Sequence, residues 1–595
     1  EASFDEAQAR TITPTFGPPI LLDLDPGRRA LGAFAARLGE SGGATAAAQL
    51  ADGTLAVVRR TTTENLMTGE VTAAEERYAA PLDRRLTALV LDVDGRTLFA
   101  GSGQGELLYW ELGEAGLSEA QAASAGGAPV TALEFLLGGR SLVVGQQDGS
   151  LSIWFPVRQS DESLRLTRIR DLPRLDGPIS LIAPSLRNKG FLAHDQAGNL
   201  GLYHSTSERT LWRGRSPLPG ATAIFFAPKA DGAFLAGQDR LAMLDIDNPH
   251  PEVSWRALFG KIWYEGYEGP EHVWQSTGGT DDFEPKLSLT PLLVGTLKGT
   301  LYALLLAIPL GVLGAMYASQ FMHPNLLRFV KPTVEIMAAL PSVVLGFLAG
   351  LWLAPALERS FPALLLMAIV LPVLVLVTGG LWRVAPRGLR GRFPTGIEVF
   401  LYTVVLGLGM WGCLAASGAF ADLVFGGSFQ GWLREATGLP YDQRNAVVVG
   451  LAMGFAVIPI IFAISEDAFS NVPRNLVAGS LALGANRWQT VTRVVLPTAS
   501  PGIFSAIMIG FGRAVGETMI VLMATGNTPI MSWNPFNGFR TLSANIAVEI
   551  PEAPQGGTLY RTLFLAALLL FILTFAVNTA AELVRQRLRR RYANL

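Results

Sequence analysis

The distribution of apolar residues divides the chain near residue 287. Before this point apolar residues occur in short runs between polar, glycine-rich turns, a pattern typical of β-strands. After it come long apolar runs of about 20 residues, the length of a membrane-spanning helix. The predicted spans lie near 291–318, 333–355, 361–382, 397–419, 446–465, 502–526 and 561–584.

The first 250 residues repeat one pattern. "VDGRTLFAGSGQGELLYWEL" (93–112) and "LGGRSLVVGQQDGSLSIWFP" (137–156) share a turn, an apolar strand, a glycine turn and a second strand. Similar copies occupy 187–205 and 229–246, with a weaker one at 50–60. The equivalent positions near the end of the second strand hold Trp110, Trp154, Tyr203 and Leu244.

A period in the forties is that of a β-propeller blade, so 1–250 are expected to form an all-β propeller of five recognisable blades, with room for one or two more. It resembles WD40-like propellers, although no Asp follows either Trp. The glycines are interpreted as turn residues rather than as a phosphate-binding loop. Residues 251–290 are aromatic and acidic, and we interpret them as a juxtamembrane linker whose Trp and Tyr suit the membrane interface.

Composition limits the chemistry available to the 595 residues. The net charge of -2 gives no indication of nucleic-acid binding. The single cysteine, Cys413, excludes an intramolecular disulfide, and five scattered histidines do not have the spacing of a metal site. No G-x-x-x-x-G-K-[ST] motif occurs, so ATP hydrolysis is expected in a separate subunit, which would bind ATP and Mg²⁺.

Positive charges in the loops predict the orientation. If the C-terminal tail is cytoplasmic, fourteen Arg and Lys residues fall on its side of the membrane and five on the other. With seven spans, the propeller then lies on the opposite side, which is the periplasm in a Gram-negative cell. Because such a domain needs a signal to cross, we expect an N-terminal anchor helix that is missing from the chain as given.

Two charged residues, Arg513 and Glu517, lie near the middle of the span predicted at 502–526. One charge at a bilayer centre costs about 2.5–3.5 kcal/mol or more. Four residues apart on one helix, the two side chains can meet. They are either a self-neutralised pair packed against other helices or a pair that lines a polar path, the usual role of ionisable residues in membranes. Lys298, near the outer end of its span, is expected to snorkel to the interface.

The loop at 466–499 contains "NLVAGSLALGANRWQTVTRVVLP". It resembles the coupling loop of ABC-importer permeases, whose pattern is Glu-Ala-Ala, three residues, Gly, nine residues, Ile, one residue, Leu-Pro. The matching residues are Gly484, Val494, Leu496 and Pro497, while Ala478, Gly479 and Ser480 replace the Glu-Ala-Ala triplet. The resemblance implies two short helices that fit a cleft of a partner ATPase; an ordinary amphipathic connector is the alternative.

A more specific resemblance follows. "GFGRAVGETMIVLMATGN" (510–527), "RTLSANIAVEIPEA" (540–553) and "VEIMAALPSVVLGFLAG" (334–350) are similar to the PstC subunit, the permease of phosphate importers. The likeness covers roughly 291–355 and 440–590. It implies the all-α type I ABC-importer permease fold, with 361–419 as an inserted helical hairpin, and a role in phosphate transport for an Arg and a Glu that match Arg513 and Glu517.

The resemblance also implies partners: a second, PstA-like permease, a PstB-like cytoplasmic ATPase dimer and a PstS-like periplasmic phosphate-binding protein. We hypothesise that Glu517 pairs with Arg513 when the path is empty and releases it to the anion. Three alternatives remain open. They are an importer of another oxyanion, a membrane-anchored propeller dehydrogenase, and a membrane-anchored propeller sensor. The roles of the propeller and of the inserted hairpin are not predicted.

Overall fold

The computed structural model describes residues 2–4, 10–12, 19–25, 27, 31–39, 43–64, 71–113, 116–159, 162–280, 282–384 and 397–592. The chain forms two compact units, Glu1–Leu287 and Ser288–Leu595, which are described separately. The expected loop arginines at 387, 390 and 392 fall outside the described residues.

Unit 1 is built from successive antiparallel sheets. The first contains β3 (Leu31–Leu38), β4 (Ala44–Leu50), β5 (Thr54–Glu64) and β6 (Val71–Pro81). The second contains β7 (Leu86–Leu91), β8 (Thr97–Ser102) and β9 (Glu106–Gly113), with β10 (Gly116–Leu117) and β11 (Gln121–Ser124) paired to β9. The third contains β12 (Val130–Phe135), β13 (Leu142–Gln146), β14 (Leu151–Arg158) and β15 (Leu164–Leu172).

The fourth sheet contains β16 (Ile179–Pro184), β17 (Gly190–Asp195), β18 (Asn199–His204) and β19 (Arg209–Arg215). The fifth contains β20 (Ala223–Phe226), β21 (Gly232–Ala236) and β22 (Leu241–Asp245). Two small pairs join β1 (Ala2–Phe4) to β2 (Arg10–Ile12) and β23 (Trp274–Gln275) to β24 (Lys286–Leu287). The first strands of neighbouring sheets pack side by side in the order β3, β7, β12, β16 and β20.

This arrangement confirms the propeller-like reading of the repeats, and the strand register shows why the repeats are visible. The equivalent hairpin positions pair as Leu98 with Trp110, Leu142 with Trp154, Phe191 with Tyr203 and Ala233 with Leu244. Trp110 and Tyr203 are fully buried between sheets. The glycines of the hairpin turns have positive φ, +77° at Gly105 and +81° at Gly149, as expected for turn residues.

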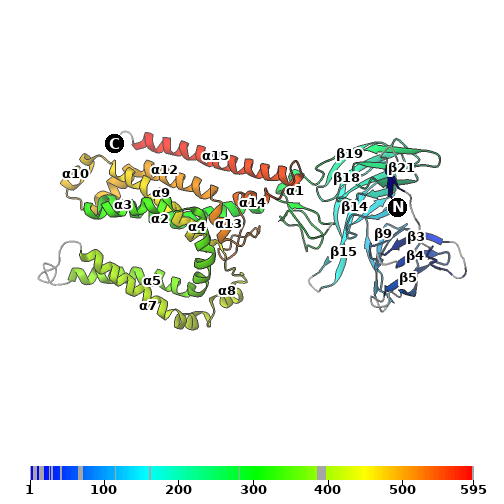
Figure 1. Cartoon of the computed structure of the whole chain (residues 1–595), viewed down its shortest axis with the longest axis horizontal. Coiled ribbons are helices and arrows are strands. Elements are labelled where there is room, and N and C mark those ends of the chain that lie inside the picture. Colours follow the sequence, from blue (N-terminus) through cyan, green and yellow to red (C-terminus); the bar gives the residue numbers. More distant parts are fainter. Residues whose placement is uncertain are drawn as a thin grey trace. The chain divides into compact units, whose positions relative to one another are not determined.

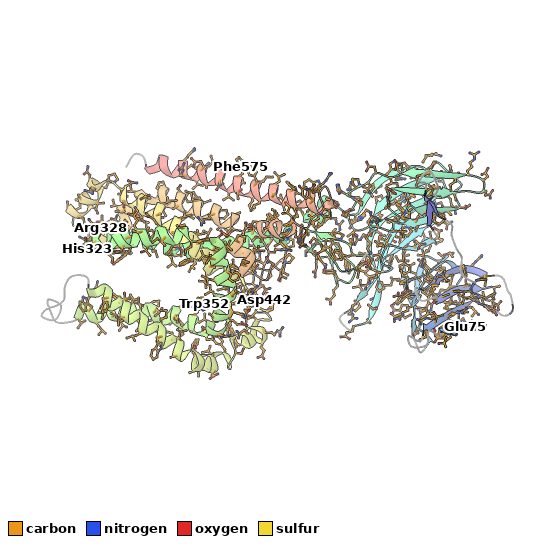
Figure 2. The ribbon with its side chains drawn as sticks, viewed as in Figure 1. Glu75, His323, Arg328, Trp352, Asp442 and Phe575 are labelled. Carbon is orange, nitrogen blue, oxygen red and sulfur yellow. The ribbon has the colours of Figure 1, made fainter. Side chains whose placement is uncertain are left out.

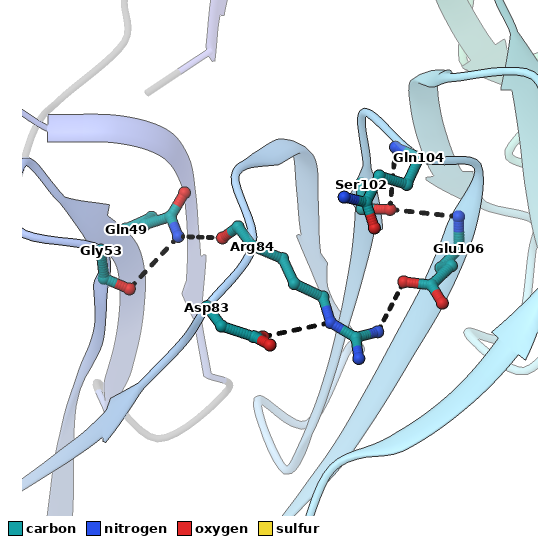
Figure 3. A network of polar contacts seen from close by, with 7 residues as sticks. All are labelled: Gln49, Gly53, Asp83, Arg84, Ser102, Gln104 and Glu106. Carbon is teal, nitrogen blue, oxygen red and sulfur yellow. Dashed lines mark hydrogen bonds and ion pairs between the residues drawn. The ribbon is translucent and has the colours of Figure 1, made fainter.

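A polar network joins the first two sheets (Figure 3). The Gln49 side chain, which is buried, donates hydrogen bonds to the carbonyls of Arg84 (2.7 Å) and Gly53 (3.3 Å) and accepts one from the Leu86 N–H. Arg84 in turn pairs with Glu106 of β9 at 2.5 Å. A buried amide with partners on both sides fixes how the two sheets meet.

Residues 251–287, which were expected to form a juxtamembrane linker, belong to the compact unit 1. Short helix α1 (Trp255–Phe259) begins this segment, and Tyr264 and Trp274 are buried. Glu265 pairs with buried Lys189 at 2.7 Å and accepts a hydrogen bond from Ser141. Aromatic side chains suit both a lipid interface and a protein surface, so their enrichment does not distinguish the two. Unlike Tyr264 and Trp274, Trp255 of α1 is 78% exposed.

Unit 2 is helical. Its helices are α2 (Thr290–Gln320), α3 (Pro324–Ala339), α4 (Ser342–Leu348), α5 (Ala354–Val384), α7 (Ile397–Phe425), α8 (Phe429–Thr437), α9 (Ala446–Ser470), α10 (Arg474–Ala482), α11 (Arg487–Thr490), α12 (Leu496–Gly516), α13 (Met519–Ala524), α14 (Leu542–Glu549) and α15 (Thr558–Tyr592). Single π-helical turns, η1 (Ala349–Leu353) and η2 (Val491–Val495), precede α5 and α12. Helices α2, α9 and α12 pack together around small residues such as Ala303, Ala307 and Ala506.

Within unit 2, α10 and the end of α15 lie at one end, and α8 and α14 lie at the other (Figure 1). His323 and Arg328 of α3 mark the first end, and Trp352 and Asp442 lie toward the second (Figure 2). Six helices in the described residues are long and apolar enough to span a membrane, which supports a multi-pass membrane protein.

Two expected spans are wrong in their boundaries. The span expected at 333–355 is broken at Leu340 and Pro341, where the backbone is extended, because proline has no N–H and disfavours helix in the residue before it. The break expected between 355 and 361 is missing, since Ser342–Val384 is one 43-residue helical stretch. The hairpin α5–α7 is therefore continuous with α4.

Candidate functional site

Glu517 lies at a break in the helix that was expected to contain it. Helix α12 ends at Gly516, Glu517 is extended (φ -67°, ψ 123°), and α13 begins at Met519. The Glu517 carboxylate accepts hydrogen bonds from the backbone N–H groups of Met519 (3.2 Å) and Ile520 (3.3 Å). It therefore satisfies two of the free N–H groups with which every helix starts.

The expected meeting of Arg513 and Glu517 on one helix face is wrong in this structure. Arg513 is exposed on α12, in line with the exposed residues Ile509 and Gly516. Within the described residues its guanidinium makes no hydrogen bond or ion pair. The other faces of α12 pack against α2, α9 and α15. An unpaired guanidinium on the open face of a membrane helix is available to an anion or to another chain.

Polar contacts hold the segment after α13 close to this break. Ser543 of α14 donates a hydrogen bond to the Glu517 carbonyl (3.1 Å), and Thr296 of α2 accepts one from the Leu542 N–H (3.0 Å). Arg540 and Glu549, both largely buried, form an ion pair of 2.9 Å across α14. The sequence analysis did not single out this pair; the only available signal was opposite charge at the two ends of one short apolar segment.

Lys298 does not snorkel, contrary to expectation. Its side chain is 1% exposed, and its ammonium donates a hydrogen bond to the Asn537 carbonyl (3.3 Å) and lies 5.6 Å from the centre of the Phe539 ring. These partners come from the loop before α14, more than 230 residues later in the chain. Lys298 therefore fixes that loop to α2 and is closed off from the exposed face of α12.

The segment expected to couple to an ATPase forms two short helices at one end of unit 2. Ala478, Gly479 and Ser480 lie in α10, with Ala478 and Gly479 exposed. The Ser480 and Thr490 hydroxyls share a hydrogen bond of 3.0 Å, which ties α10 to α11. Leu496 and Pro497 begin α12, so they lie behind the loop rather than on its tip.

The turn between these helices is the most exposed part of the loop. Gly484 has φ +89°, a conformation that favours glycine. Next to it Leu483 is 92% exposed, and Trp488 of α11 is 57% exposed. Exposed apolar side chains on a well-capped helical turn are typical of a protein interface. Asn486 and Gln489 form a capping box that fixes the start of α11.

No group of three or more potential metal ligands occurs among the residues that the structure describes. Arg513, close to the α12–α13 break, is exposed and without a partner among the described residues, and Leu483 and Trp488 are exposed on the α10–α11 turn. A free guanidinium attracts anions, and exposed apolar side chains on a loop favour contact with another protein.

Comparison with known proteins finds relatives among membrane transport permeases. A family profile described as "Binding-protein-dependent transport system inner membrane component" matches residues 307–591. The "Phosphate transport system permease protein PstC" of Xylella fastidiosa is 31% identical over 255 residues, which cover 41% of this chain and 76% of that protein. The "Phosphate transport system permease protein PstC 1" of Mycobacterium tuberculosis is 28% identical over 304 residues, covering 50% and 72%.

The "Probable ABC transporter permease protein YqgH" of Bacillus subtilis is 24% identical over 294 residues, covering 49% of this chain and 70% of that protein. A chain in the crystal structure of a mitotic checkpoint complex overlaps 38% of this chain at 14% identity with a TM-score of 0.25, too low to define a shared fold.

Proposed function

This chain belongs to the family of binding-protein-dependent transport system inner membrane components, and we propose that it is the permease subunit through which an ATP-driven importer moves inorganic phosphate across the cytoplasmic membrane. Membership of the PstC type rests on the relative that is 31% identical over three quarters of its length. We propose phosphate as the transported anion, import as the direction of transport, and the other subunits of the importer as partners.

The observation that carries the proposal is the unpaired Arg513 guanidinium on the exposed face of α12. A guanidinium stays charged and offers planar pairs of N–H donors that suit the oxygens of phosphate. Opposite it we expect the second, PstA-like permease, so that the anion passes between the two chains. A charge at such a place attracts an anion strongly because little water screens it.

Release of the anion requires a competitor for Arg513, and we assign that role to Glu517. While the Glu517 carboxylate is held by the Met519 and Ile520 N–H groups, the Arg513 guanidinium is free to bind phosphate. If Glu517 leaves these groups and turns to Arg513, the anion loses its partner. This exchange is a hypothesis that corrects the sequence-based version: the carboxylate alternates between a helix start and the guanidinium.

Energy is expected to come from a PstB-like ATPase dimer that binds the α10–α11 turn. The exposed Leu483 and Trp488 support this assignment. We expect this end to lie in the cytoplasm, because the predicted loop arginines on its side follow the positive-inside rule. Unit 1 would then face the periplasm, where a PstS-like protein delivers phosphate. ATP and Mg²⁺ would bind the ATPase.

The test is ATP-dependent uptake of labelled phosphate by the reconstituted complex. Arg513→Gln is compared with Arg434→Gln, a matched change on α8 away from the break, with assembly and ATPase activity measured in both. We expect Arg513→Gln to lose uptake while Arg434→Gln keeps it. Uptake that persists in Arg513→Gln would remove Arg513 from the path. If the wild-type complex does not transport phosphate but transports another oxyanion, the assignment as an importer stands and the assignment of phosphate as its substrate is wrong.

A further inference from the structure

The two broken membrane helices of unit 2 meet through their second halves. Helix α4 follows the break at Pro341, α13 follows the break at Glu517, and the two pack against each other. Two glycines, both buried, make the contact. A methyl group on Gly346 would lie 2.8 Å from the Met519 carbonyl oxygen and 3.0 Å from the Ile520 Cα atom, and one on Gly350 would overlap the Met523 carbonyl oxygen.

The Gly346 contacts fall on the residues that hold the Glu517 carboxylate, whereas Gly350 lies against Met523 and Ala524 at the end of α13. Met519 and Ile520 supply the two N–H groups that bind it, and the same two residues lie against Gly346. Because the contacts are to backbone atoms, an added side chain cannot be accommodated by a rotamer change. Any shift of α4 against α13 therefore moves the N–H groups that hold Glu517.

We propose that Gly346 and Gly350 are positioning residues that hold α13 in register for Glu517, Gly346 at the start of the helix and Gly350 at its end. This inference rests on the proposed function, because it takes Glu517 to be part of the anion path. The helix that carries both glycines continues without a break through η1 into α5, so the inserted hairpin α5–α7 is joined by a single helix to this contact. A movement of the hairpin α5–α7 would therefore reach the Glu517 carboxylate through this helix.

The first experiment measures geometry without transport. In a Cys413→Ser background, Thr518→Cys reports on the break through its rate of labelling by a water-soluble thiol reagent in the reconstituted complex. Gly346→Ala and Gly350→Ala are compared with Gly380→Ala, a glycine of the same continuous helix with no atom within 4 Å of the added methyl group. We expect the first two to change the labelling rate and the third to leave it unchanged. Equal rates in all three would overturn the positioning role.

The second experiment asks whether the glycines act through Glu517. We expect Gly346→Ala to lower the maximal rate of phosphate uptake at least about tenfold with little change in KM, since misplacement of a reacting group by a fraction of an ångström has effects of this size. In a Glu517→Gln background the same change should cause no further loss. An additional loss as large as in the wild type would overturn the inference.

Two outcomes separate this inference from the proposed function. If Glu517→Gln leaves uptake intact, Glu517 is not part of the anion path, and the glycines have no role in transport through it. The effect of the glycines on the labelling rate is then still valid. If Arg513→Gln and Glu517→Gln abolish uptake but Gly346→Ala leaves the rate of uptake unchanged, the path stands and the inference falls. Should the alanine variants fail to assemble, Leu345→Ala shortens a side chain of α4 that packs on the core cluster containing Ile520, and it must give the same pattern.

Discussion

Lys331 of α3 and Glu466 of α9 form an ion pair of 3.0 Å. Glu466 is 5% exposed, and its other carboxylate oxygen accepts a hydrogen bond from Ser470 (2.9 Å). Helix α9 ends at Ser470, only a few residues before α10 begins at Arg474. The pair therefore fixes the point from which the proposed coupling loop leaves the membrane bundle.

Replacing Lys331 with methionine is expected to destabilise the protein by about 1–2 kcal/mol, because it leaves a buried carboxylate without its cation while the half-exposed lysine site lets water offset part of the loss. Thermal unfolding of the purified protein followed by tryptophan fluorescence measures this. The double variant with Glu466→Gln should regain part of the stability. Arg328→Met, a change of the same kind on the exposed side of α3, is the control, and an equal loss there would contradict the role of the pair.

Gly484→Ala tests the conformation of the coupling turn. At φ +89° an alanine is strained by about 1 kcal/mol, and nothing lies near the added methyl group, so the effect is confined to the backbone. We expect less ATPase to remain bound after size-exclusion chromatography. Gly438→Ala, at φ +70° and equally free of neighbours, imposes the same strain at the end of α8. If both variants retain the ATPase equally, the turn is not the docking point.

The repeated sheets could be predicted from the sequence because their signals are local. A turn glycine, such as Gly105 or Gly149, and a large residue at a fixed distance, such as Trp110 or Trp154, set the hairpin register within about 20 residues. The membrane helices were visible for a similar reason, since each span is a continuous apolar run. The loop proposed to bind the ATPase was predicted from a spacing pattern, and a local capping box fixes the start of its second helix.

What the sequence did not reveal depends on contacts between distant residues. Apart from Arg513 and Glu517 the apolar pattern runs through 502–526, so hydrophobicity does not mark the helix break that the Glu517 carboxylate stabilises by hydrogen bonds. Lys298 has the position of an interfacial lysine, and only its distant partner Asn537 explains why it is buried. Pro341 is a local signal for the break before α4, but prolines inside membrane helices, such as Pro362 and Pro459 here, make such a signal ambiguous.

His204 predicts how the stability of unit 1 depends on pH. Its side chain is fully buried, one ring nitrogen shares a hydrogen bond with the Ser207 hydroxyl (3.0 Å), and the other has no partner. Burial, followed by the nearby Arg170, lowers the pKa of His204 to about 3. The folded protein thus keeps this ring neutral at pH values where the unfolded chain, with a pKa near 6.5, takes up a proton.

Stability should therefore fall as the pH drops from about 6.5 towards 3, and the loss from this group is about 2 kcal/mol at pH 5. Above pH 6.5 the group has no effect. Urea unfolding at pH 5 and pH 7.5, followed by hydrogen exchange of peptides from β17 and β18, measures the difference. His204→Leu should reduce the pH dependence whatever its effect on stability at pH 7.5. An unchanged pH dependence would show that the unfolded chain gains no extra proton at this position.

The base of the hairpin α5–α7 is held by an aromatic cluster around Phe429, against which Phe361 packs. The Phe361 ring stacks on Phe429 of α8 with centres 4.5 Å apart and meets the ring of Phe536 edge-on at 5.3 Å. Phe536 belongs to the loop that also contains Asn537, the partner of Lys298. Phe361→Ala is expected to cost about 2–3 kcal/mol, less than for a fully buried ring because Phe361 is half-buried, and to loosen the hairpin from this loop.

Phe400→Ala is the control, since Phe400 lies on the exposed side of α7, 66% exposed, and its loss should cost no more than about 0.5 kcal/mol. Unfolding in detergent gives both values. The reporter at Thr518→Cys adds a functional reading: because α5 continues into α4, a hairpin freed at its base should also change labelling at the break. A large loss of stability with unchanged labelling would mean that the cluster supports the hairpin without transmitting its position to Glu517.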